Sequence, residues 1–99
     1  MSSISLLLRE LFSQHRELEE LRTLIQKHQL DSWLVGGCLR DLLLNRVSAD
    51  IDIATAGDPT ELARNWARQN QGHWFWLDAD RLQSRVLLPD RLTIDFSPL

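Results

Sequence analysis

The sequence predicts an α+β fold in which helices pack against one mixed β-sheet. Residues 4–30 carry apolar side chains at helical spacing, residues 32–71 alternate strand-like and helix-like segments, and residues 73–96 hold three strand-like runs separated by turns. With 99 residues and 43% hydrophobic side chains, the chain can bury one modest core. One core shared by helices and sheet is therefore expected.

The N-terminal segment, residues 4–30, is expected to be helical. Its apolar side chains recur every three or four residues, but the polar stretch Gln14–Arg16 interrupts the pattern, which predicts two helices or one bent helix. His15 and His28 lie among polar neighbours, and neither has a second histidine or a cysteine at ligand spacing. Both are expected to be surface histidines without a chemical role.

A short buried strand, a glycine turn and a helix are predicted next. Ser32–Val35 is largely apolar and strand-like, and Gly36 and Gly37 end it. Cys38–Leu44 then places its leucines on one helical face. The polar segment Asn45–Ala49 is expected to connect this helix to the following strand.

The following strand and helix are indicated by alternation and by a helix start signal. Residues 50–53 alternate aspartate and isoleucine, the period of a strand with one polar and one apolar face. Asp58 and Pro59 predict a helix start, with Asp58 as N-cap and Pro59 in the first helical position. This helix is expected to bury Trp66 and to stop at Asn70–Gly72.

Three strands are predicted in the rest of the chain, at His73–Leu77, Arg85–Leu88 and Leu92–Phe96. The aromatic run Trp74–Trp76 is expected to lie mostly in the sheet core, and a base-stacking surface is the alternative. No closing helix follows the last strand before Leu99. This ending predicts a fragment or a truncated protein.

The distribution of charge along the chain indicates which kinds of ligand the chain is suited to bind. Residues 31–60 carry two basic and five acidic side chains, while the segments before and after them are balanced. A chain whose local excess is negative is not expected to bind RNA or DNA by itself, but it is suited to holding a divalent cation. A solvated acidic surface is the alternative.

Cysteine content and hydropathy indicate the compartment. The single cysteine, Cys38, excludes an internal disulfide and a cysteine-based zinc site, and it fits a reducing environment. Because no histidine is close to it in sequence, Cys38 is not expected to be a nucleophile. No signal peptide or membrane-spanning apolar run is apparent, so a cytoplasmic protein without a membrane partner is expected.

The glycine pair forms a candidate phosphate site. Gly36 and Gly37 let the backbone turn sharply and approach a ligand closely. The helix expected to start near Cys38 would present unpaired N–H groups and the positive end of its dipole to an anion. Arg40, in the first turn of that helix, can contact two phosphate oxygens at once. A turn that needs glycine for steric reasons alone is the alternative.

Asp50 and Asp52 form a candidate metal site. Residues i and i+2 of a strand point the same way, with Cα atoms about 6.6 Å apart. The two carboxylates would repel each other unless a cation lies between them. Ligation by oxygen alone favours Mg²⁺ or Mn²⁺ over zinc. Two solvent-exposed acids on a strand are the alternative.

Asp95 is a candidate third acid. It lies on the polar side of the last predicted strand, and it would join the other carboxylates if that strand pairs beside residues 50–54. Such a cluster suits phosphoryl transfer with two metal ions, one lowering the pKa of an attacking hydroxyl and the other holding a triphosphate. A half-exposed aspartate on an edge strand is the alternative.

Taken together, these segments resemble a known family. The segments Leu-Val-Gly-Gly-Cys-Leu-Arg-Asp-Leu-Leu at 34–43 and Asp-Ile-Asp-Ile-Ala-Thr at 50–55 resemble the head domain of class II tRNA nucleotidyltransferases (CCA-adding enzymes) and bacterial poly(A) polymerases. The resemblance is strongest over residues 33–59, and residues 75–78 and 93–99 match the later head strands more loosely. It implies a nucleotidyltransferase-like fold of the polymerase β type.

The resemblance also implies roles for the candidate residues. Gly37 and Arg40 would bind the incoming CTP or ATP, with Gly36 shaping the loop. The Asp50–Asp52 pair would hold Mg²⁺ (or Mn²⁺), and Asp95 would be the third acid. The attacking group would be the 3′-hydroxyl of tRNA or of another RNA, and pyrophosphate would leave.

The chain departs from the family pattern in two ways. Asn45 stands where the family usually has glycine, and the segments that select the base and shape its pocket do not occur within the 99 residues. We therefore expect residues 1–30 to be a helical extension and residues 31–99 to be a partial head domain, truncated at the C-terminus and inactive alone. Contacts to tRNA, and the choice between CC, A, CCA and poly(A) addition, would depend on regions outside this chain.

Two other functions stay open from the sequence. One is a stand-alone, non-catalytic module that binds a nucleotide or docks a partner protein through a tryptophan-rich sheet edge. The other is a small nucleotidyltransferase of the antitoxin-linked kind, which modifies a protein or another RNA. The genomic sequence that follows Leu99 would help to distinguish these alternatives from the head of a tRNA enzyme.

Overall fold

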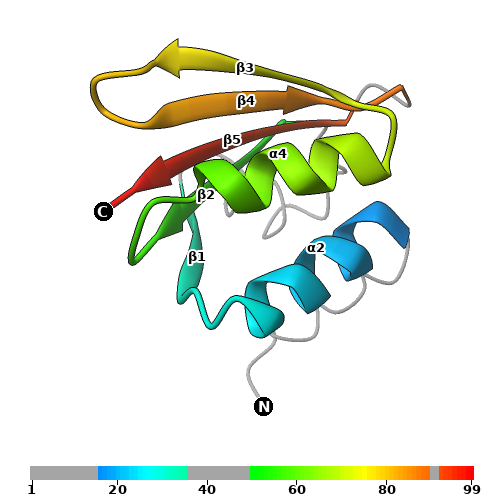
Figure 1. The fold of residues 1–99 in the computed structure, drawn as a ribbon, viewed down its shortest axis with the longest axis horizontal. Coiled ribbons are helices and arrows are strands. Elements are labelled where there is room, and N and C mark those ends of the chain that lie inside the picture. Colours follow the sequence, from blue (N-terminus) through cyan, green and yellow to red (C-terminus); the bar gives the residue numbers. More distant parts are fainter. Residues whose placement is uncertain (1–15, 36–49, 90–91) are drawn as a thin grey trace, which may run out of the picture.

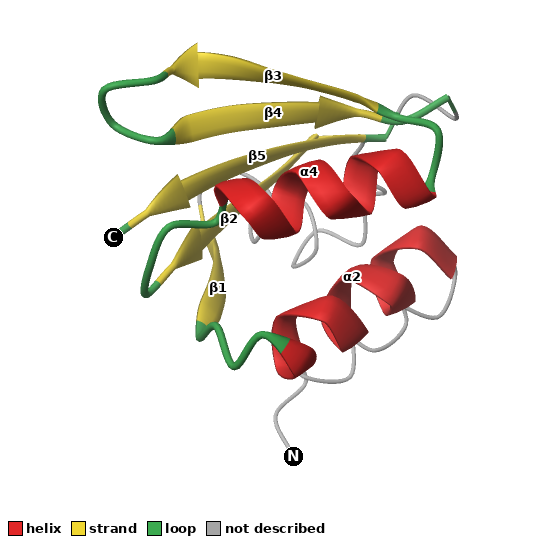
Figure 2. Cartoon of the chain, in the orientation of Figure 1, coloured by secondary structure: helices red, strands yellow, loops and turns green. Residues whose placement is uncertain are grey.

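The structure, a computed structural model, describes residues 16–35, 50–89 and 92–99. In these residues it contains two helices and five strands (Figure 1). They are α2 (Arg16–Lys27), β1 (Ser32–Val35), β2 (Asp50–Thr55), α4 (Thr60–Gln69), β3 (His73–Asp78), β4 (Gln83–Leu87) and β5 (Thr93–Pro98). The α+β class predicted from the sequence is confirmed (Figure 2). The features predicted at residues 1–15 and 36–49 lie outside the described residues.

The five strands form one mixed sheet in the order β1-β2-β5-β4-β3. β2 and β5 are parallel neighbours, and the other three pairs are antiparallel. A parallel pair needs a crossover connection, and the chain between β2 and β5 runs through α4, β3 and β4. This topology places β5 in the middle of the sheet, beside the strand that carries the two aspartates.

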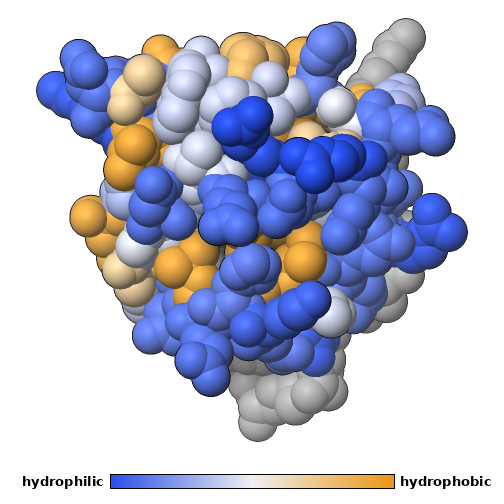
Figure 3. Space-filling view, in the orientation of Figure 1, coloured by the Kyte–Doolittle hydropathy of each residue, from blue (hydrophilic) through white to orange (hydrophobic). Residues whose placement is uncertain are grey.

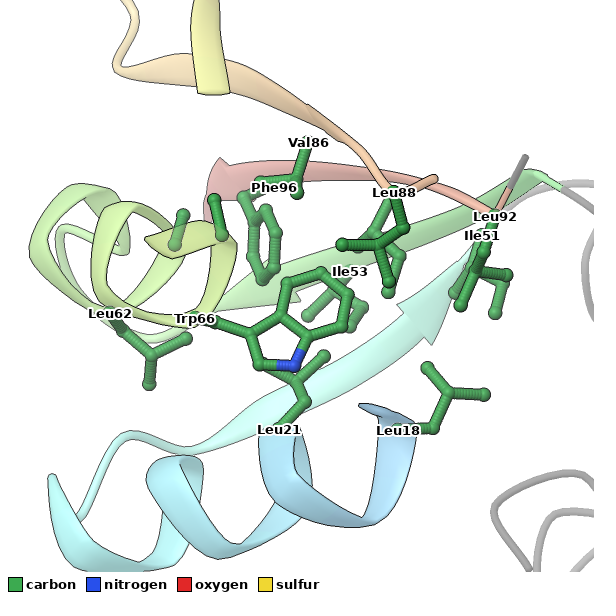
Figure 4. Packing of buried hydrophobic residues seen from close by; sticks show 13 residues of the cluster. Leu18, Leu21, Ile51, Ile53, Leu62, Trp66, Val86, Leu88, Leu92 and Phe96 are labelled. Atoms are coloured by element: carbon green, nitrogen blue, oxygen red, sulfur yellow. The ribbon is translucent and has the colours of Figure 1, made fainter. Parts of the chain in front are cut away.

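Both helices cover the same face of the sheet, and the core lies between the two layers (Figure 4). Trp66 of α4 is fully buried between Leu21 of α2 and the sheet residues Ile53 and Phe96. Its ring lies 6.2 Å from the Phe96 ring in an edge-to-face contact. The Trp66 Nε1–H also donates a hydrogen bond of 2.7 Å to the backbone carbonyl of Glu17, which ties α4 to α2.

The N-terminal helix α2 belongs to this core through one face. Leu18 and Leu21 are buried, while Arg16 and Glu20 form an ion pair of 3.6 Å in solvent. Figure 3 shows the helix-covered side of the molecule, where hydrophilic side chains cover most of the surface. No helix in the described part of the chain is long and apolar enough to cross a membrane. The division of the chain near residue 30 stays a prediction.

The start of α4 differs by one residue from the sequence prediction. Pro59 is the N-cap and Thr60 the first helical residue, whereas the sequence predicted Asp58 as N-cap. Asp58 still serves the helix start, because its Oδ1 accepts hydrogen bonds from the Thr60 N–H at 2.9 Å and from the Thr60 hydroxyl at 2.6 Å. The first helical bond joins the Ala63 N–H to the Pro59 carbonyl. The carboxylate therefore caps the first turn from one position earlier in the chain.

The aromatic run Trp74–Trp76 lies less in the core than the sequence predicted. Trp74 is partly buried against the core, and the guanidinium carbon of Arg64 lies 4.9 Å from the centre of its ring. Phe75 and Trp76 are each 39% exposed. The prediction was wrong for these two residues because β3 lies at an edge of the described sheet, and a local run of residues does not encode strand order.

Gly72, which follows α4, is expected to tolerate no side chain. Its N–H donates a hydrogen bond of 2.7 Å to the Ala67 carbonyl. An added Cβ would lie 2.7 Å from Leu88 Cδ2 and 3.0 Å from the carbonyl oxygen of Leu87. Gly72→Ala is therefore expected to lower the free energy of unfolding by about 1–3 kcal/mol, measured by urea denaturation.

Gly57 provides the matched control for this prediction. A Cβ at Gly57 would meet the flexible end of Leu30, with Cδ1 3.3 Å away. Because that side chain can move, Gly57→Ala is expected to change the free energy of unfolding by less than about 0.5 kcal/mol. Equal losses of stability in the two variants would contradict the crowding inferred at Gly72.

Candidate metal and nucleotide site

The face of the sheet opposite the helices carries the candidate carboxylates. Successive side chains of a strand point to opposite faces. β2 buries its two isoleucines against the helices, so Asp50 and Asp52 point to the other face. β5 buries Ile94 and Phe96 in the same way, which places Asp95 on the same face as the two β2 aspartates.

The register of three strands brings Asp52, Asp95 and Arg85 into one row. Asp52 of β2 pairs with Asp95 of β5, and Asp95 pairs with Arg85 of β4. Neighbouring strands lie about 4.8 Å apart, so these three side chains are immediate neighbours. Asp50 lies two residues before Asp52 on the same side of β2. The sequence made Asp95 a candidate on the condition that the last strand pairs beside residues 50–54, and this condition is met.

Arg85 holds both carboxylate oxygens of Asp95. Its Nε donates to Oδ1 at 2.7 Å, and its Nη2 donates to Oδ2 at 2.9 Å. This two-bond geometry is the strong form of an arginine–carboxylate contact. The hydrogen bonds that Arg85 donates to Asp95, together with the negative charge of Asp95, raise the pKa of the Arg85 guanidinium, and the charges of Asp50 and Asp52 add to this effect. Arg85 is therefore a fixed positive charge beside the candidate metal residues.

A pocket of about 330 Å³ opens over this row of side chains. Its lining comes from β2, β4 and β5, and consists of Asp50, Ile51, Asp52, Arg85, Leu87, Thr93 and Asp95. Burial raises the pKa of Asp52, and the charges of Asp95 and Asp50 raise it further, while Arg85 lowers it. The ionised form of Asp52 is thus held next to other negative charges, an arrangement that a bound cation would relieve.

The oxygen donors of the pocket fit a hard divalent cation. Asp50 and Asp52 present carboxylates from one face of one strand, the kind of ligand that Mg²⁺ prefers. Asp95 lies beside them, but both of its oxygens are bound by Arg85. No group of three histidine, cysteine, aspartate or glutamate side chains converges as a metal site within the described residues. The β2 pair therefore fits an ion, and the part of Asp95 in holding one stays a prediction.

Arg85 was not among the site residues predicted from the sequence. Ser84 and Val86 are buried on either side of it, and this alternation was available as a sign that Arg85 lies on the polar face. Its contact with Asp95 depends on how β4 and β5 are aligned, which the turn between them sets. In that turn the Leu88 N–H bonds the Leu92 carbonyl at 2.9 Å. Sequence alternation indicates the face of a residue but not its partner on the next strand.

The three predicted nucleotide-binding residues, Gly36, Gly37 and Arg40, lie outside the described residues. β1 ends at Val35, whose backbone pairs with Asp52 of β2. The chain therefore leaves β1 beside the carboxylates, at the point where the glycine pair follows in sequence. The part of these three residues in binding a nucleotide stays a prediction.

Sequence comparisons relate the chain to RNA-modifying enzymes. Residues 32–96 match the poly A polymerase head domain family. The CC-adding tRNA nucleotidyltransferase of Geobacter sulfurreducens is 44% identical over 69 residues, which are 69% of this chain and 16% of the relative. The chain spans about one sixth of the length of the curated relatives it matches.

Solved structures of such enzymes share the fold. A CCA-adding enzyme in complex with CTP has a TM-score of 0.78 and 29% identity, over 98% of this chain and 23% of that one. The Thermotoga maritima CCA-adding enzyme in complex with tRNA has a TM-score of 0.69 and 29% identity, over 84% of this chain and 21% of that one. The family match runs from β1 to Phe96 and includes the row of Asp52, Asp95 and Arg85. The chain therefore belongs to the poly(A) polymerase head domain family.

Proposed function

We propose that this chain supplies the metal-binding and triphosphate-binding part of a nucleotidyltransferase that extends RNA 3′ ends. The observation that carries the proposal is the parallel pairing of β2 and β5, which sets Asp52 beside Asp95 in an open pocket. The relative from Geobacter sulfurreducens is a CC-adding tRNA nucleotidyltransferase. Of the two CCA-adding enzymes that share the fold, one was solved in complex with CTP and the other in complex with tRNA. We infer CTP or ATP as nucleotide donor and the 3′-hydroxyl of tRNA, or of another RNA, as acceptor.

Asp50 and Asp52 are the proposed ligands of the divalent cation, with Mg²⁺ preferred and Mn²⁺ as a substitute. When bound, the ion would lower the pKa of the attacking hydroxyl and balance the charge of the triphosphate. The two side chains project from a central strand whose opposite face is packed in the core. The sheet thus holds them in a fixed geometry. Asp95 is proposed as the third acid of the site.

Gly36, Gly37 and Arg40 are proposed to contact the triphosphate. Glycines allow the backbone N–H groups to approach phosphate oxygens, and a guanidinium can bind two of these oxygens at once. β1 leads into this segment from a position paired with Asp52. A triphosphate held there would lie next to the ion on the β2 carboxylates.

The acceptor RNA is proposed to be bound mainly by protein outside these 99 residues. The formal net charge of the chain is −3, which disfavours a large phosphate-binding surface. Within the chain, residues 1–30 are proposed to be a helical extension and residues 31–99 a partial head domain. The described helix of the extension, α2, buries leucines in the core that it shares with the sheet.

A reducing cytoplasm is the proposed compartment, because Cys38 is the single cysteine.

Calorimetry with Mg²⁺ and CTP or ATP tests this proposal. Wild-type chain is expected to bind Mg²⁺–nucleotide, and Asp50→Ala is expected to weaken binding at least about tenfold, since one of two charged ligands is lost. Asp80→Asn, in the exposed turn between β3 and β4, is the matched control and should bind as wild type does. Binding that is unchanged by Asp50→Ala in a folded protein would overturn the metal assignment.

A partner-docking module is the second candidate, and the exposed aromatic edge favours it. Phe75, Trp76 and Leu77 of β3 are 39%, 39% and 46% exposed. Apolar side chains on an edge strand are suited to contact with another protein. If the folded chain binds neither Mg²⁺ nor nucleotide in the titration above, this candidate becomes the favoured one.

A further inference from the structure

We propose that Phe75, on the edge strand β3, stacks on a base near the 3′ end of the acceptor RNA and so directs the terminal hydroxyl to the carboxylate pocket. This inference rests on the proposed function and names a residue of this chain that contacts the acceptor. Protein outside the chain supplies most of the affinity for RNA, as proposed above. The part assigned to Phe75 is to place the end of the strand.

The strand register places Phe75 on the same face of the sheet as the carboxylates. Phe75 of β3 pairs with Arg85 of β4, and Arg85 pairs with Asp95 of β5. Side chains directly opposite each other on paired strands share one face of the sheet. Phe75 therefore extends the row that begins with Asp52 and Asp95. The row ends in an aromatic side chain that is 39% exposed.

Leu87 adds apolar surface between the carboxylates and the edge of the sheet. It lies two residues after Arg85 on β4, which places it on the same face, and it is 41% exposed where it lines the pocket. Its backbone pairs with Thr93 of β5 on one side and with His73 of β3 on the other. The open face is therefore acidic over β2 and becomes apolar and aromatic over β4 and β3. The apolar part suits the faces of nucleosides.

The geometry of the proposed reaction brings the acceptor over this apolar part. In phosphoryl transfer the attacking and leaving oxygens lie roughly in line, on opposite sides of the phosphorus. The triphosphate is proposed to lie beside the end of β1, where Val35 pairs with Asp52. Pyrophosphate then leaves toward β1, and the attacking hydroxyl approaches from the other side, over β5 and β4.

The width of the sheet suits a short single strand between the ion and Phe75. Neighbouring strands lie about 4.8 Å apart, so the backbones at Asp52 and Phe75 are about 14 Å apart across the three strand pairs. A terminal nucleoside whose hydroxyl meets the ion lies over Leu87, and the base before it reaches Phe75. Exposed aromatic side chains on open sheets bind single-stranded RNA by such stacking, which tolerates any base. Phe75 thus positions the RNA end without selecting its sequence.

Contact with another protein is the alternative use of an exposed aromatic residue on an edge strand. Trp76 distinguishes the two uses, because it is also 39% exposed but lies on the opposite face of β3. It pairs with Ser84, which is fully buried on the helix-covered side of β4. A protein bound along the whole edge would contact both aromatic residues, whereas RNA that enters the pocket contacts Phe75 alone.

Fluorescence anisotropy of a 5′-labelled single-stranded cytidine tetranucleotide, titrated with the 99-residue chain in Mg²⁺ at low salt, tests the inference. Phe75→Ala is expected to bind the RNA about tenfold more weakly than wild type, because the stacking of one base is lost. Phe75→Trp keeps an aromatic ring and should bind at least as tightly as wild type. Trp76→Ala, the loss of an equally exposed aromatic residue on the other face, is the matched control and should bind as wild type does.

Proton NMR of the same RNA adds a measurement of stacking itself. The ring current of Phe75 is expected to shift base protons of the bound RNA upfield. Phe75→Leu keeps an apolar side chain of similar size and should abolish this shift. A shift that is the same in wild type and in Phe75→Leu would overturn the inference.

The outcomes decide the inference separately from the proposed function, because the RNA titration contains no nucleotide donor. If the calorimetry supports the metal site, but the RNA does not bind or binds wild type and folded Phe75→Ala equally, the proposed function stands and Phe75 has no such part. Equal weakening by Phe75→Ala and Trp76→Ala indicates contact along the whole edge and overturns the inference too. RNA binding through Phe75 in a chain that binds no Mg²⁺–nucleotide overturns both proposals. Circular dichroism of each variant establishes that the fold is retained.

Discussion

In a nucleotidyltransferase that contains this chain, as proposed above, Asp52→Asn is expected to reduce nucleotidyl transfer by about a thousandfold. The asparagine keeps the size and shape of the side chain but removes the negative charge that would hold the metal ion. Without that ion, the negative charge that develops in the transition state is less well stabilised. Loss of one such preorganised group lowers the rate by about 10²–10³. Incorporation of radiolabelled CTP or ATP into tRNA at saturating Mg²⁺ measures the effect. Asp80→Asn should retain wild-type transfer.

The same substitution is expected not to destabilise the fold. Burial and the neighbouring acids raise the pKa of Asp52 above 3.8, so the folded chain binds this proton more tightly than the unfolded chain does. Stability contributed by this group therefore falls as the pH rises through the raised pKa. At neutral pH, Asp52→Asn should be as stable as wild type or more stable by up to about 0.5 kcal/mol, since the group is partly screened by solvent. Retained transfer in this well-folded variant would contradict the assignment of Asp52.

Trp66→Ala is expected to lower the free energy of unfolding by about 3–5 kcal/mol. Trp66 is completely buried, contacts the Phe96 ring, and donates the hydrogen bond to Glu17 that joins the two helices. The substitution leaves a large cavity between the helix layer and the sheet (Figure 4) and removes the side-chain hydrogen bond between α4 and α2. A domain of this size has about 5–15 kcal/mol of stability in total, so the variant should be close to unfolding. Urea denaturation followed by circular dichroism measures the loss.

Two further variants test whether position or residue type causes this loss. Trp66→Phe keeps an aromatic ring in the core and loses the hydrogen bond, so it should cost less than Trp66→Ala. Trp76→Ala removes the same side chain from an edge strand where it is 39% exposed, and it should cost less than about 1.5 kcal/mol. Comparable losses for Trp66→Ala and Trp76→Ala would be incompatible with the central position of Trp66.

Local patterns predicted the described elements of this fold well. Alternation of aspartate and isoleucine marked β2, and the apolar stripe of α4 correctly indicated Trp66 as a core residue. The predicted N-cap of α4, Asp58, lies one residue before the observed N-cap, Pro59. Asp58 accepts the hydrogen bond of the Thr60 N–H from outside the helix. Such errors at helix ends are small, since neighbouring backbone positions can satisfy the same N–H group.

Local patterns did not predict the order of the strands in the sheet, as the aromatic run Trp74–Trp76 shows. Phe75 and Trp76 have the composition of a buried strand, yet β3 lies at the edge of the described sheet and both side chains are exposed. The burial of a strand depends on what lies on either side of it, which residues far away in sequence decide. A run of six residues carries no such information.

The candidate site likewise has features that the sequence determines and features that depend on the tertiary structure. The sequence by itself determined that Asp50 and Asp52 share one face of a strand, because side chains alternate with a period of two residues. Its ordered motifs also indicated the family. Only the tertiary structure decided that β5 lies parallel to β2, so that Asp95 is next to Asp52, and that β4 aligns Arg85 with Asp95. These contacts join residues 10 or more positions apart, and their register follows from the packing of the whole sheet against its helices.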